Sequence, residues 1–511
     1  MKSQLKAGAI LSYLALFINS VISILYTPIM LSLLGQSEYG LYSLASAAAG
    51  YVGVLNFGLG NALIRYTAKY KALNDEKGCS TLYGLFFIMY GILGVLALVV
   101  GIMLTINADL IFSNSLSIKE LNKLKIILGI MVANISIGIG FGMFSVIILA
   151  HEKFIFQKMT VIISSLINPI IVLPLLLMGY GSITMALVTT LINCLTVMIN
   201  MYFCFKKIKI RIVFEKIEKG LFKDIIIFSS YIFLNLVIGQ LYWSTDQVIL
   251  GIYSGTVAVS VYAIGASFTG YFSGFSSAIS NVFLTKVSTM VTKDATDNEL
   301  SDLFIRVGRV QYIIISFALS GFIVFGQEFI LLWVGNDYNQ SYTIAIIILI
   351  PMLVSLIQGM GGIILQAKNM QGFKSVVNFS VAIVNVILSI IFVQKWGAIG
   401  CAIATAISFT LGNIIIMNVY YWKKIQLDIL KYWINILSMS TPAAISILYC
   451  ITLNNLIIAS NWIVLFIKIL IFSMTYIFVM WFTSLNKYEK DLLIVPVKRV
   501  TQRLKVKDSI L

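Results

Sequence analysis

Two stretches of this 511-residue chain decide its fold: FINSVISILY at residues 17–26 and FLNLVIGQLY at residues 233–242. They align without a gap, and Phe, Asn, Val, Ile, Leu and Tyr occupy the same six positions in both. An apolar run of helix length that recurs in this way indicates an internal duplication of a membrane-spanning unit.

The duplication extends well beyond these two stretches. Further matches at offsets of 216 to 220 residues pair Tyr42 with Tyr262, Asn61 with Asn281, Gly142 with Gly359, and Gly181 with Gly397. Each copy contains six predicted spans, so both copies enter the membrane in the same direction. Two parallel six-helix lobes around a central cavity are typical of transporters.

The composition requires a membrane protein. Hydrophobic residues make up 59% of the chain and charged residues 11%, whereas soluble proteins are about half apolar and about a quarter charged. Mean hydropathy is +0.97. These values disfavour a soluble enzyme, a nucleic-acid binder and a disordered protein. Because the apolar runs lack period-2 alternation, they predict helices rather than a membrane barrel.

The apolar runs predict an all-α polytopic fold with fourteen transmembrane helices. Its expected parts are an N-terminal six-helix lobe (1–205), a cytoplasmic linker (206–224), a C-terminal six-helix lobe (225–421), transmembrane helices 13 and 14 (432–484) and a basic cytoplasmic tail (485–511). The basic first residues followed by a long apolar run, with no small-residue cleavage site, predict a retained first span.

The basic residues predict the orientation. If the N-terminus is cytoplasmic, the inner segments hold 31 of the 36 Lys and Arg residues, and the outer segments hold only Lys119, Lys123, Lys125 and Lys395. Cytoplasmic loops of membrane proteins carry this excess. Both termini are therefore expected inside. The net charge of +16 then reflects topology rather than nucleic-acid binding.

Several chemistries have no matching residues. The single histidine, His151, excludes a His-based metal site, and the five cysteines form no CxxC pair. The sequence contains no GxxxxGK[ST] loop and no readable catalytic constellation. We therefore expect no catalytic residues, no metal and no enzymatic activity.

A small set of polar residues remains inside the spans. Asn19 lies about eleven residues into the first span, roughly 16 Å deep at 1.5 Å per residue, and Asn235 lies at the same depth in span 7. Asn56 and Gln240 are further candidates. Such side chains either form hydrogen bonds between helices or line a cavity that can bind sugar hydroxyls.

Asp246 is a carboxylate within an apolar span, near the outer end of span 7. It is either an interfacial residue capped by local donors or a Na⁺ or H⁺ coupling site in the second lobe. In the second case Asn385 and Thr405 are plausible oxygen donors.

Basic residues lie near the predicted cytoplasmic ends of spans 2 and 9. Arg65 closes span 2, and Arg306 and Arg309 open span 9 on one helix face. They either anchor the helices at the interface or bind a pyrophosphate through bidentate hydrogen bonds. Lys468, inside span 14, is expected to extend toward the outer interface.

Three stretches resemble a known family: LLGQSEYGLYSLASAAAGYVGVLNFGLGNALIRYTAKY (33–70), LYWSTDQVILGIYSGTVAVSVYAIGA (241–266) and WGAIGCAIATAI (396–407). They are similar to polysaccharide flippases of the multidrug/oligosaccharidyl-lipid/polysaccharide exporter superfamily. The resemblance implies a 6+6 bundle that works by alternating access in the bacterial cytoplasmic membrane.

The same resemblance implies a substrate and partners. The substrate would be an undecaprenyl-pyrophosphate-linked oligosaccharide, moved from the inner to the outer leaflet for O-antigen, lipopolysaccharide, capsule or exopolysaccharide assembly. A polysaccharide polymerase and chain-length proteins would be partners. The alternatives are a multidrug or other cation antiporter of the same fold and a membrane scaffold. Against the antiporter, span 1 contains no carboxylate where many multidrug members have an Asp.

Overall fold

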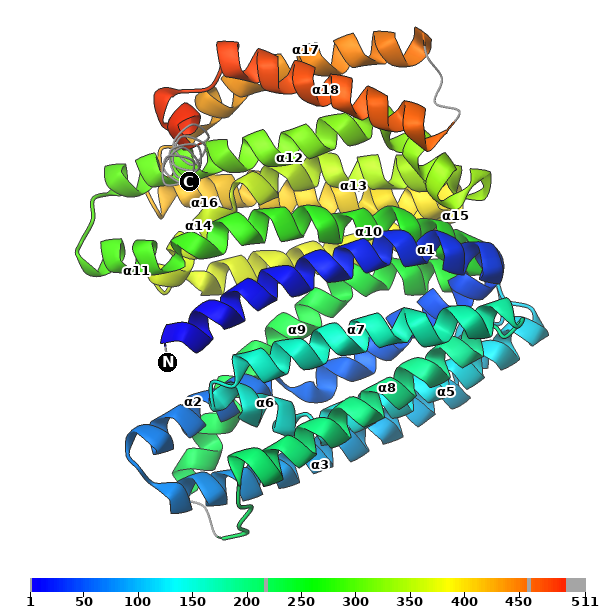
Figure 1. Cartoon of the computed structure of the whole chain (residues 1–511), viewed down its shortest axis with the longest axis vertical. Coiled ribbons are helices and arrows are strands. Elements are labelled where there is room, and N and C mark those ends of the chain that lie inside the picture. Colours follow the sequence, from blue (N-terminus) through cyan, green and yellow to red (C-terminus); the bar gives the residue numbers. More distant parts are fainter. Residues whose placement is uncertain (1, 216–218, 457–460, 493–511) are drawn as a thin grey trace, which may run out of the picture. The chain divides into compact units, whose positions relative to one another are not determined.

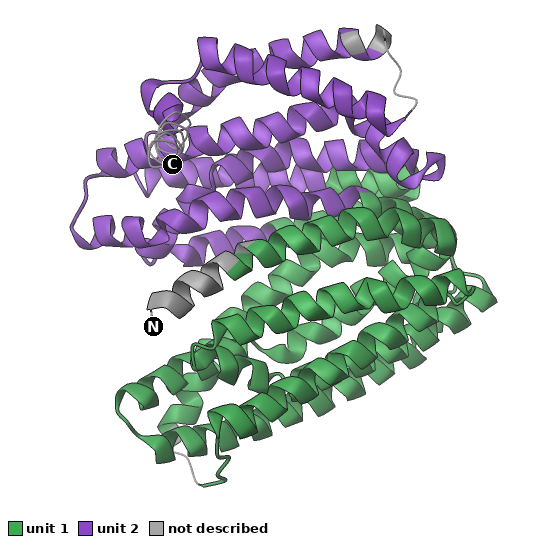
Figure 2. Ribbon diagram, viewed as in Figure 1, with its two compact units in different colours: residues 1–264, 381–404 green, residues 265–380, 405–511 purple. Residues whose placement is uncertain are grey.

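The computed structural model describes residues 2–215, 219–456 and 461–492, and in these ranges it contains helices and no strands (Figure 1). Residues 493–511, most of the expected basic tail, lie outside the described residues. The chain divides into two compact units, shown in Figure 2. Unit 1 comprises Met1–Ile264 and Val381–Ala404, and unit 2 comprises Gly265–Ser380 and Thr405–Leu511. The lobe boundaries expected from the duplication stay a prediction.

The helices of the first half of the chain are long and closely spaced. They are α1 (Lys2–Gly53), α2 (Leu59–Ala72), α3 (Glu76–Ile106), α4 (Ala108–Phe112), α5 (Ile118–Gly140), α6 (Met143–Ala150), α7 (Phe154–Leu177), α8 (Ser182–Phe203) and α9 (Lys219–Tyr253). Within unit 1, α1 packs against α5 and α7, and α8 packs against α5 and α7. These four helices surround the cavity described below.

The second half of the described chain is also built of helices. Its α-helices are α10 (Gly255–Ser280), α11 (Leu284–Thr292), α12 (Asp297–Val334), α13 (Asn339–Ile357), α14 (Gly359–Ala367), α15 (Gln371–Phe409), α16 (Met417–Lys423), α17 (Ile429–Leu456) and α18 (Trp462–Thr483). In unit 2, α12 contacts α13, α17 and α18, and α17 and α18 run side by side (Figure 1). Short 3₁₀ and π segments connect several helices: Val54–Asn56, Cys204–Ile208, Asn281–Phe283, Asn336–Tyr338 and Thr410–Ile416.

The duplication is visible in the backbone as well as in the sequence. Residues with left-handed φ at helix ends recur at offsets of 217 or 220 residues. The pairs are Gly35 and Gly255, Asn74 and Asp294, Glu152 and Asn369, and Lys209 and Gln426. A left-handed residue commonly terminates a helix. The two copies therefore end corresponding helices in the same way.

The chain between α1 and α2 departs from a helical path. The helical path is interrupted at Phe57 (φ 55°) and Gly58 (φ 66°), between the 3₁₀ turn Val54–Asn56 and α2. A Cβ on Gly58 would lie 2.4 Å from Ile232 Cγ2 of α9, and Phe57 stacks on Phe233 with ring centroids 4.7 Å apart. The break therefore lets the chain pack closely against α9.

Eleven stretches of the described chain are long and apolar enough to cross a membrane. Two of them, Leu14–Ala72 and Gln371–Lys423, are longer than a single crossing and contain non-helical residues at Gly35 and Gly397. The helix α10 is not among the eleven. The multi-pass membrane fold is thus confirmed, and the count of fourteen spans stays a prediction.

Candidate functional site

A polar cavity of about 710 Å³ lies within unit 1, between α1, α5, α7 and α8. Each of the four helices contributes one amide side chain: Asn19 from α1, Asn134 from α5, Asn168 from α7 and Asn193 from α8. The other polar residues of the lining are Ser23, Tyr26, Ser164, Ser165, Thr189 and Thr196. The lining contains no Asp, Glu, Lys, Arg or His, so the cavity is polar and uncharged at neutral pH.

Part of this polar lining is already hydrogen-bonded between helices. Asn193 donates to the Oδ1 of Asn134 at 2.5 Å, and Asn168 donates to the hydroxyl of Thr189 at 3.0 Å. By contrast, Asn19 Oδ1 and the Tyr26 hydroxyl are buried without a hydrogen-bond partner in the described part of the chain. Unsatisfied buried polar groups are costly. These two groups on α1 are therefore available to a ligand.

Prolines shape the walls of the cavity. Pro169 follows Asn168 directly within α7, Pro174 lies further along that helix, and Pro28 lies within α1, two residues after Tyr26. Proline has no amide hydrogen and clashes with the preceding turn, so it bends a helix and releases a backbone carbonyl. Pro169 itself lies in the lining of the cavity, beside Asn168.

Of the residues predicted for the substrate cavity, only Asn19 lines this space. Asn56 is exposed in the 3₁₀ turn that precedes α2, and Asn235 is exposed on α9 and donates to the Tyr231 carbonyl of its own helix. Gln240 donates to the Ala47 carbonyl of α1 at 3.2 Å. Arg65 is exposed on α2, with its guanidinium 5.1 Å from the Phe228 ring centroid.

Asp246 is buried, with an exposed fraction of 2%, and it is held by groups from other helices. The Tyr262 hydroxyl of α10 donates to Oδ2 at 2.5 Å, and the Ser389 hydroxyl of α15 donates to Oδ1 at 2.7 Å. Asn385 is also buried, and its Oδ1 lies 3.3 Å from the same Ser389 hydroxyl. All four residues belong to unit 1, whereas Thr405 is buried in unit 2.

The oxygen atoms around Asp246 are the type of donor set that a small hard cation requires. Among the described residues, no group of three or more His, Cys, Asp or Glu side chains is placed to hold a metal ion. The Asp246 cluster contains a single carboxylate with amide and hydroxyl groups. This chemistry suits a weakly bound monovalent cation or a proton better than a tightly bound structural metal.

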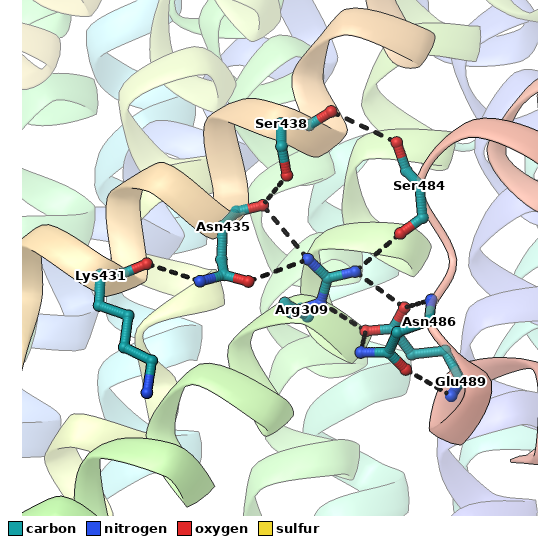
Figure 3. A network of polar contacts seen from close by, with 7 residues as sticks. All are labelled: Arg309, Lys431, Asn435, Ser438, Ser484, Asn486 and Glu489. Atoms are coloured by element: carbon teal, nitrogen blue, oxygen red, sulfur yellow. Dashed lines mark hydrogen bonds and ion pairs between the residues drawn. The ribbon is translucent and has the colours of Figure 1, made fainter.

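Arg309 is placed in a closed network within unit 2, shown in Figure 3. Its Nε and Nη2 donate to the two carboxylate oxygens of Glu489 at 2.6 and 3.0 Å. Nη1 donates to Asn435 Oδ1 at 3.3 Å, and Nη2 also donates to the Ser484 carbonyl at 2.8 Å. In this structure protein groups occupy the donors of Arg309, and its predicted role in pyrophosphate binding stays a prediction. Arg306 is exposed, and its guanidinium lies 4.8 Å from the Tyr488 ring centroid.

The sequence predicts that Lys468 extends to the outer interface, but the structure shows that it does not. Its side chain is buried within unit 2 and forms an ion pair with Glu328 of α12 at 2.9 Å. Asn454 of α17 supplies a further acceptor at 2.7 Å. Glu328 is within reach because α12 continues to Val334.

The bundle of long apolar helices defines a polytopic membrane protein with the fold of two known transporter structures. The inward-closed lipid II flippase MurJ matches 95% of this chain and 99% of its own, with a TM-score of 0.73 and 17% identity. An inward-facing multidrug resistance MATE family transporter of the MOP superfamily matches 80% of this chain and 98% of its own, with a TM-score of 0.63 and 15% identity.

The family follows from the sequence. The model of the polysaccharide biosynthesis protein family matches residues 5–284, more than half of the chain, and the chain belongs to this family. A curated relative from Haloferax volcanii, described as the probable low-salt glycan biosynthesis flippase Agl15, is 24% identical over 188 residues. That alignment covers 37% of this chain and 40% of the relative. The resemblance drawn from the sequence is confirmed.

Several residues of these sites escape the sequence argument. Asn134, Asn168 and Asn193 lie inside predicted spans, so the criterion that selected Asn19, a polar side chain deep in an apolar run, would also have selected them. Ser389 carries no such signal, because a hydroxyl within a helix commonly bonds to its own backbone. Its contact with Asp246 depends on how α9 and α15 pack.

Proposed function

We propose that this protein is a flippase that moves undecaprenyl-pyrophosphate-linked oligosaccharide units from the inner to the outer leaflet of the bacterial cytoplasmic membrane. The observation that carries the proposal is the uncharged, amide-lined cavity of unit 1. Its amides and hydroxyls can donate to and accept from sugar hydroxyls. Asn19 Oδ1 and the Tyr26 hydroxyl are buried there without a hydrogen-bond partner among the described residues. Family membership supports a role in glycan assembly.

The transport cycle would be alternating access between the two lobes that the duplication predicts. Asp246, with Ser389 and Asn385, is the proposed site of a coupling Na⁺ or H⁺, because a buried carboxylate needs a cation, hydrogen-bond donors or protonation. The N- and C-termini would face the cytoplasm, as the distribution of Lys and Arg predicts. The glycan would be O-antigen, capsule or exopolysaccharide, and a polymerase with chain-length proteins would act on it afterwards.

The second candidate is an antiporter for drugs or other cations. Cation recognition usually requires an acidic side chain in the cavity, and the cavity lining in unit 1 has none. The buried Asp246 is the observation that favours this candidate. The two functions predict different phenotypes and can be separated in one experiment.

The test is deletion of the gene, complementation with the wild-type chain, and analysis of lipid-linked glycans by mass spectrometry. For a flippase, lipid-linked repeat units accumulate on the cytoplasmic side, and surface glycan disappears until the gene is restored. Drug sensitivity with normal surface glycan would instead support the antiporter. Normal glycan together with normal drug resistance would contradict both transport functions and leave a scaffold.

A further inference from the structure

A second polar pocket lies at one end of unit 1, apart from the amide-lined cavity. Its volume is about 540 Å³, and three separate segments form it: the turn between α2 and α3, the residue that follows α6, and residues 208–211 after α8. Three cationic side chains face it, Lys71, Lys209 and Arg211, together with His151. The predicted topology assigns all three segments to the cytoplasmic side.

The segment after α8 is held in place by several specific contacts. A π-helical turn, Cys204–Ile208, ends at Lys209, which has a left-handed φ of 60°. The Cys204 thiol donates to the Phe144 carbonyl at 3.3 Å, and the Val213 amide donates to the Ser80 carbonyl of α3 at 3.1 Å. Because Gly84 has no side chain, α3 can approach this segment closely: a Cβ there would lie 2.1 Å from the Val213 oxygen. These contacts hold the backbone on both sides of Lys209 and Arg211 in place.

The three cations have no carboxylate partner in the described chain. Nearby Lys77 forms an ion pair with Glu215 at 3.2 Å, but neither residue lines the pocket. Lys71, Lys209 and Arg211 form no ion pair in the described ranges. Because no ion pair engages these three cations, they can contact an added anion.

The remaining charged residues of the pocket are two acids at the start of α3. The Asp75 carboxylate caps α3 by accepting from the Gly78 amide at 2.7 Å, and Glu76 follows it. Carboxylates are acceptors for hydroxyl groups, whereas Arg and Lys are donors for phosphate oxygens. The pocket thus offers donors for a phosphate beside acceptors for hydroxyls.

We infer that this pocket binds a phosphate ester that carries neighbouring hydroxyl groups, with Lys71, Lys209 and Arg211 around the phosphate. Glycerol phosphate has this chemistry, either as a phospholipid headgroup or as a soluble ester. The inference goes beyond the proposed transport function and does not depend on it, because the amide-lined cavity and the Asp246 cluster use other residues.

His151 provides a reporter inside the pocket. It is the only histidine in the chain, its Nδ1 lies 3.0 Å from the Ile147 carbonyl, and its ring centroid lies 6.4 Å from that of Tyr83. Burial, together with the nearby charges of Lys71 and Lys153, lowers the pKa of His151 below its ordinary value of 6.5. Asp75, Glu76, Lys209 and Arg211 are the other charged groups around the pocket. A bound phosphate favours the imidazolium, so the pKa should rise.

The experiment uses the full chain, purified without a polyhistidine tag, in phosphatidylcholine nanodiscs. The His151 pKa is measured by NMR during titration with glycerol 1-phosphate, and in parallel in nanodiscs that contain phosphatidylglycerol. We expect a saturable rise in the pKa. A rise only with glycerol 1-phosphate identifies a soluble ester, and a rise only with phosphatidylglycerol identifies a lipid headgroup.

Matched variants show whether the pocket itself is responsible. In Lys71→Gln/Arg211→Gln the apparent affinity for the effective ligand should fall at least about tenfold, since two charge-assisted contacts are lost. In Lys77→Gln the response should be unchanged, because Lys77 is also exposed but does not line the pocket. All three of the changed side chains are exposed, so folding is expected to be preserved. No pKa rise in either arm, or an equal response in the double variant, would overturn the inference.

Discussion

Arg309 of α12 and Glu489, which follows α18, form a buried ion pair with two parallel contacts of 2.6 and 3.0 Å. Only 6% of Arg309 and 3% of Glu489 is exposed. At the other end of α12, Glu328 forms an ion pair with Lys468 of α18. The two α12 residues are 19 positions apart, about 28 Å at 1.5 Å per residue, close to the thickness of the hydrocarbon core.

These two pairs attach the helices that follow the duplication, α17 and α18, to α12 at both ends within unit 2. Asn435 and Asn454 of α17 contribute to the same networks. The two added helices are therefore an integral part of unit 2. We expect them to move together with α12 in any transport cycle.

Removing the charge of Glu489 should destabilise the protein. In Glu489→Gln, Arg309 remains buried without a counter-charge, and the loss of one partner of a buried pair costs about 3 kcal/mol. Thermal unfolding in detergent measures the change. Asp302→Asn removes the acid of an exposed pair with Lys431 and should have little effect. Equal melting temperatures for wild type and Glu489→Gln would show that the pair is not important for stability.

The pair at the opposite end of α12 should behave as a coupled unit. Lys468→Met leaves Glu328 without its cation, and Glu328→Gln leaves Lys468 buried and charged. We expect each single variant to lower the free energy of unfolding by about 2–4 kcal/mol. The double variant Lys468→Met/Glu328→Gln should lower it by less than the sum of the two single effects. A double-mutant cycle of unfolding free energies measures this coupling. Strict additivity would mean that the two side chains do not interact energetically.

The amide-lined cavity should determine transport rather than stability. Asn19→Leu replaces an unsatisfied buried acceptor by an apolar group, so we expect wild-type or higher thermal stability with transport reduced at least about tenfold. Flipping of a lipid-linked oligosaccharide in proteoliposomes is the measurement. Asn107→Leu, at the exposed end of α3, is the control and should transport normally. Normal flipping by Asn19→Leu would exclude Asn19 from the substrate path.

Ion coupling should depend on Asp246. If Asp246 binds the coupling ion, Asp246→Asn should abolish the dependence of transport on a Na⁺ or H⁺ gradient, and Ser389→Ala should weaken it by removing a hydroxyl 2.7 Å from the carboxylate. Gradient-dependent flipping in proteoliposomes tests both variants. Thr410→Ala, whose hydroxyl bonds to its own helix, is the control. A gradient dependence that persists unchanged in Asp246→Asn would disprove the coupling role.

The helix break before α2 should tolerate no side chain at Gly58. Gly58→Ala forces an L-residue into left-handed φ and places its Cβ 2.4 Å from Ile232. The unfavourable φ alone should lower the free energy of unfolding by roughly 1 kcal/mol, and we expect the clash to lower it well beyond that. Gly179→Ala has a positive φ with open space and should show the backbone effect only. Gly91→Ala, in open space within α3, should be neutral or stabilising. Chemical or thermal unfolding ranks the three variants, and equal stability of the first two would contradict the clash.

The limits of the sequence argument are clearest at single residues. Asn19 was found because a polar side chain deep in an apolar run is costly, and that signal is local. Arg309, Gln240 and Lys468 carry the same local signal, but their partners, Glu489, Ala47 and Glu328, lie between 140 and 193 positions away. No local pattern identifies such partners.

The sequence by itself determined the membrane class, the duplication and the family, because each of these depends on composition, repetition or motifs along the chain. The tertiary structure decided which polar residues share a space: four amides meet between α1, α5, α7 and α8, and Arg309 is enclosed by Glu489 and Asn435. The physical reason is that burial and hydrogen bonding depend on how distant helices pack. The sequences of apolar helices with similar composition do not indicate which helix faces will pack together.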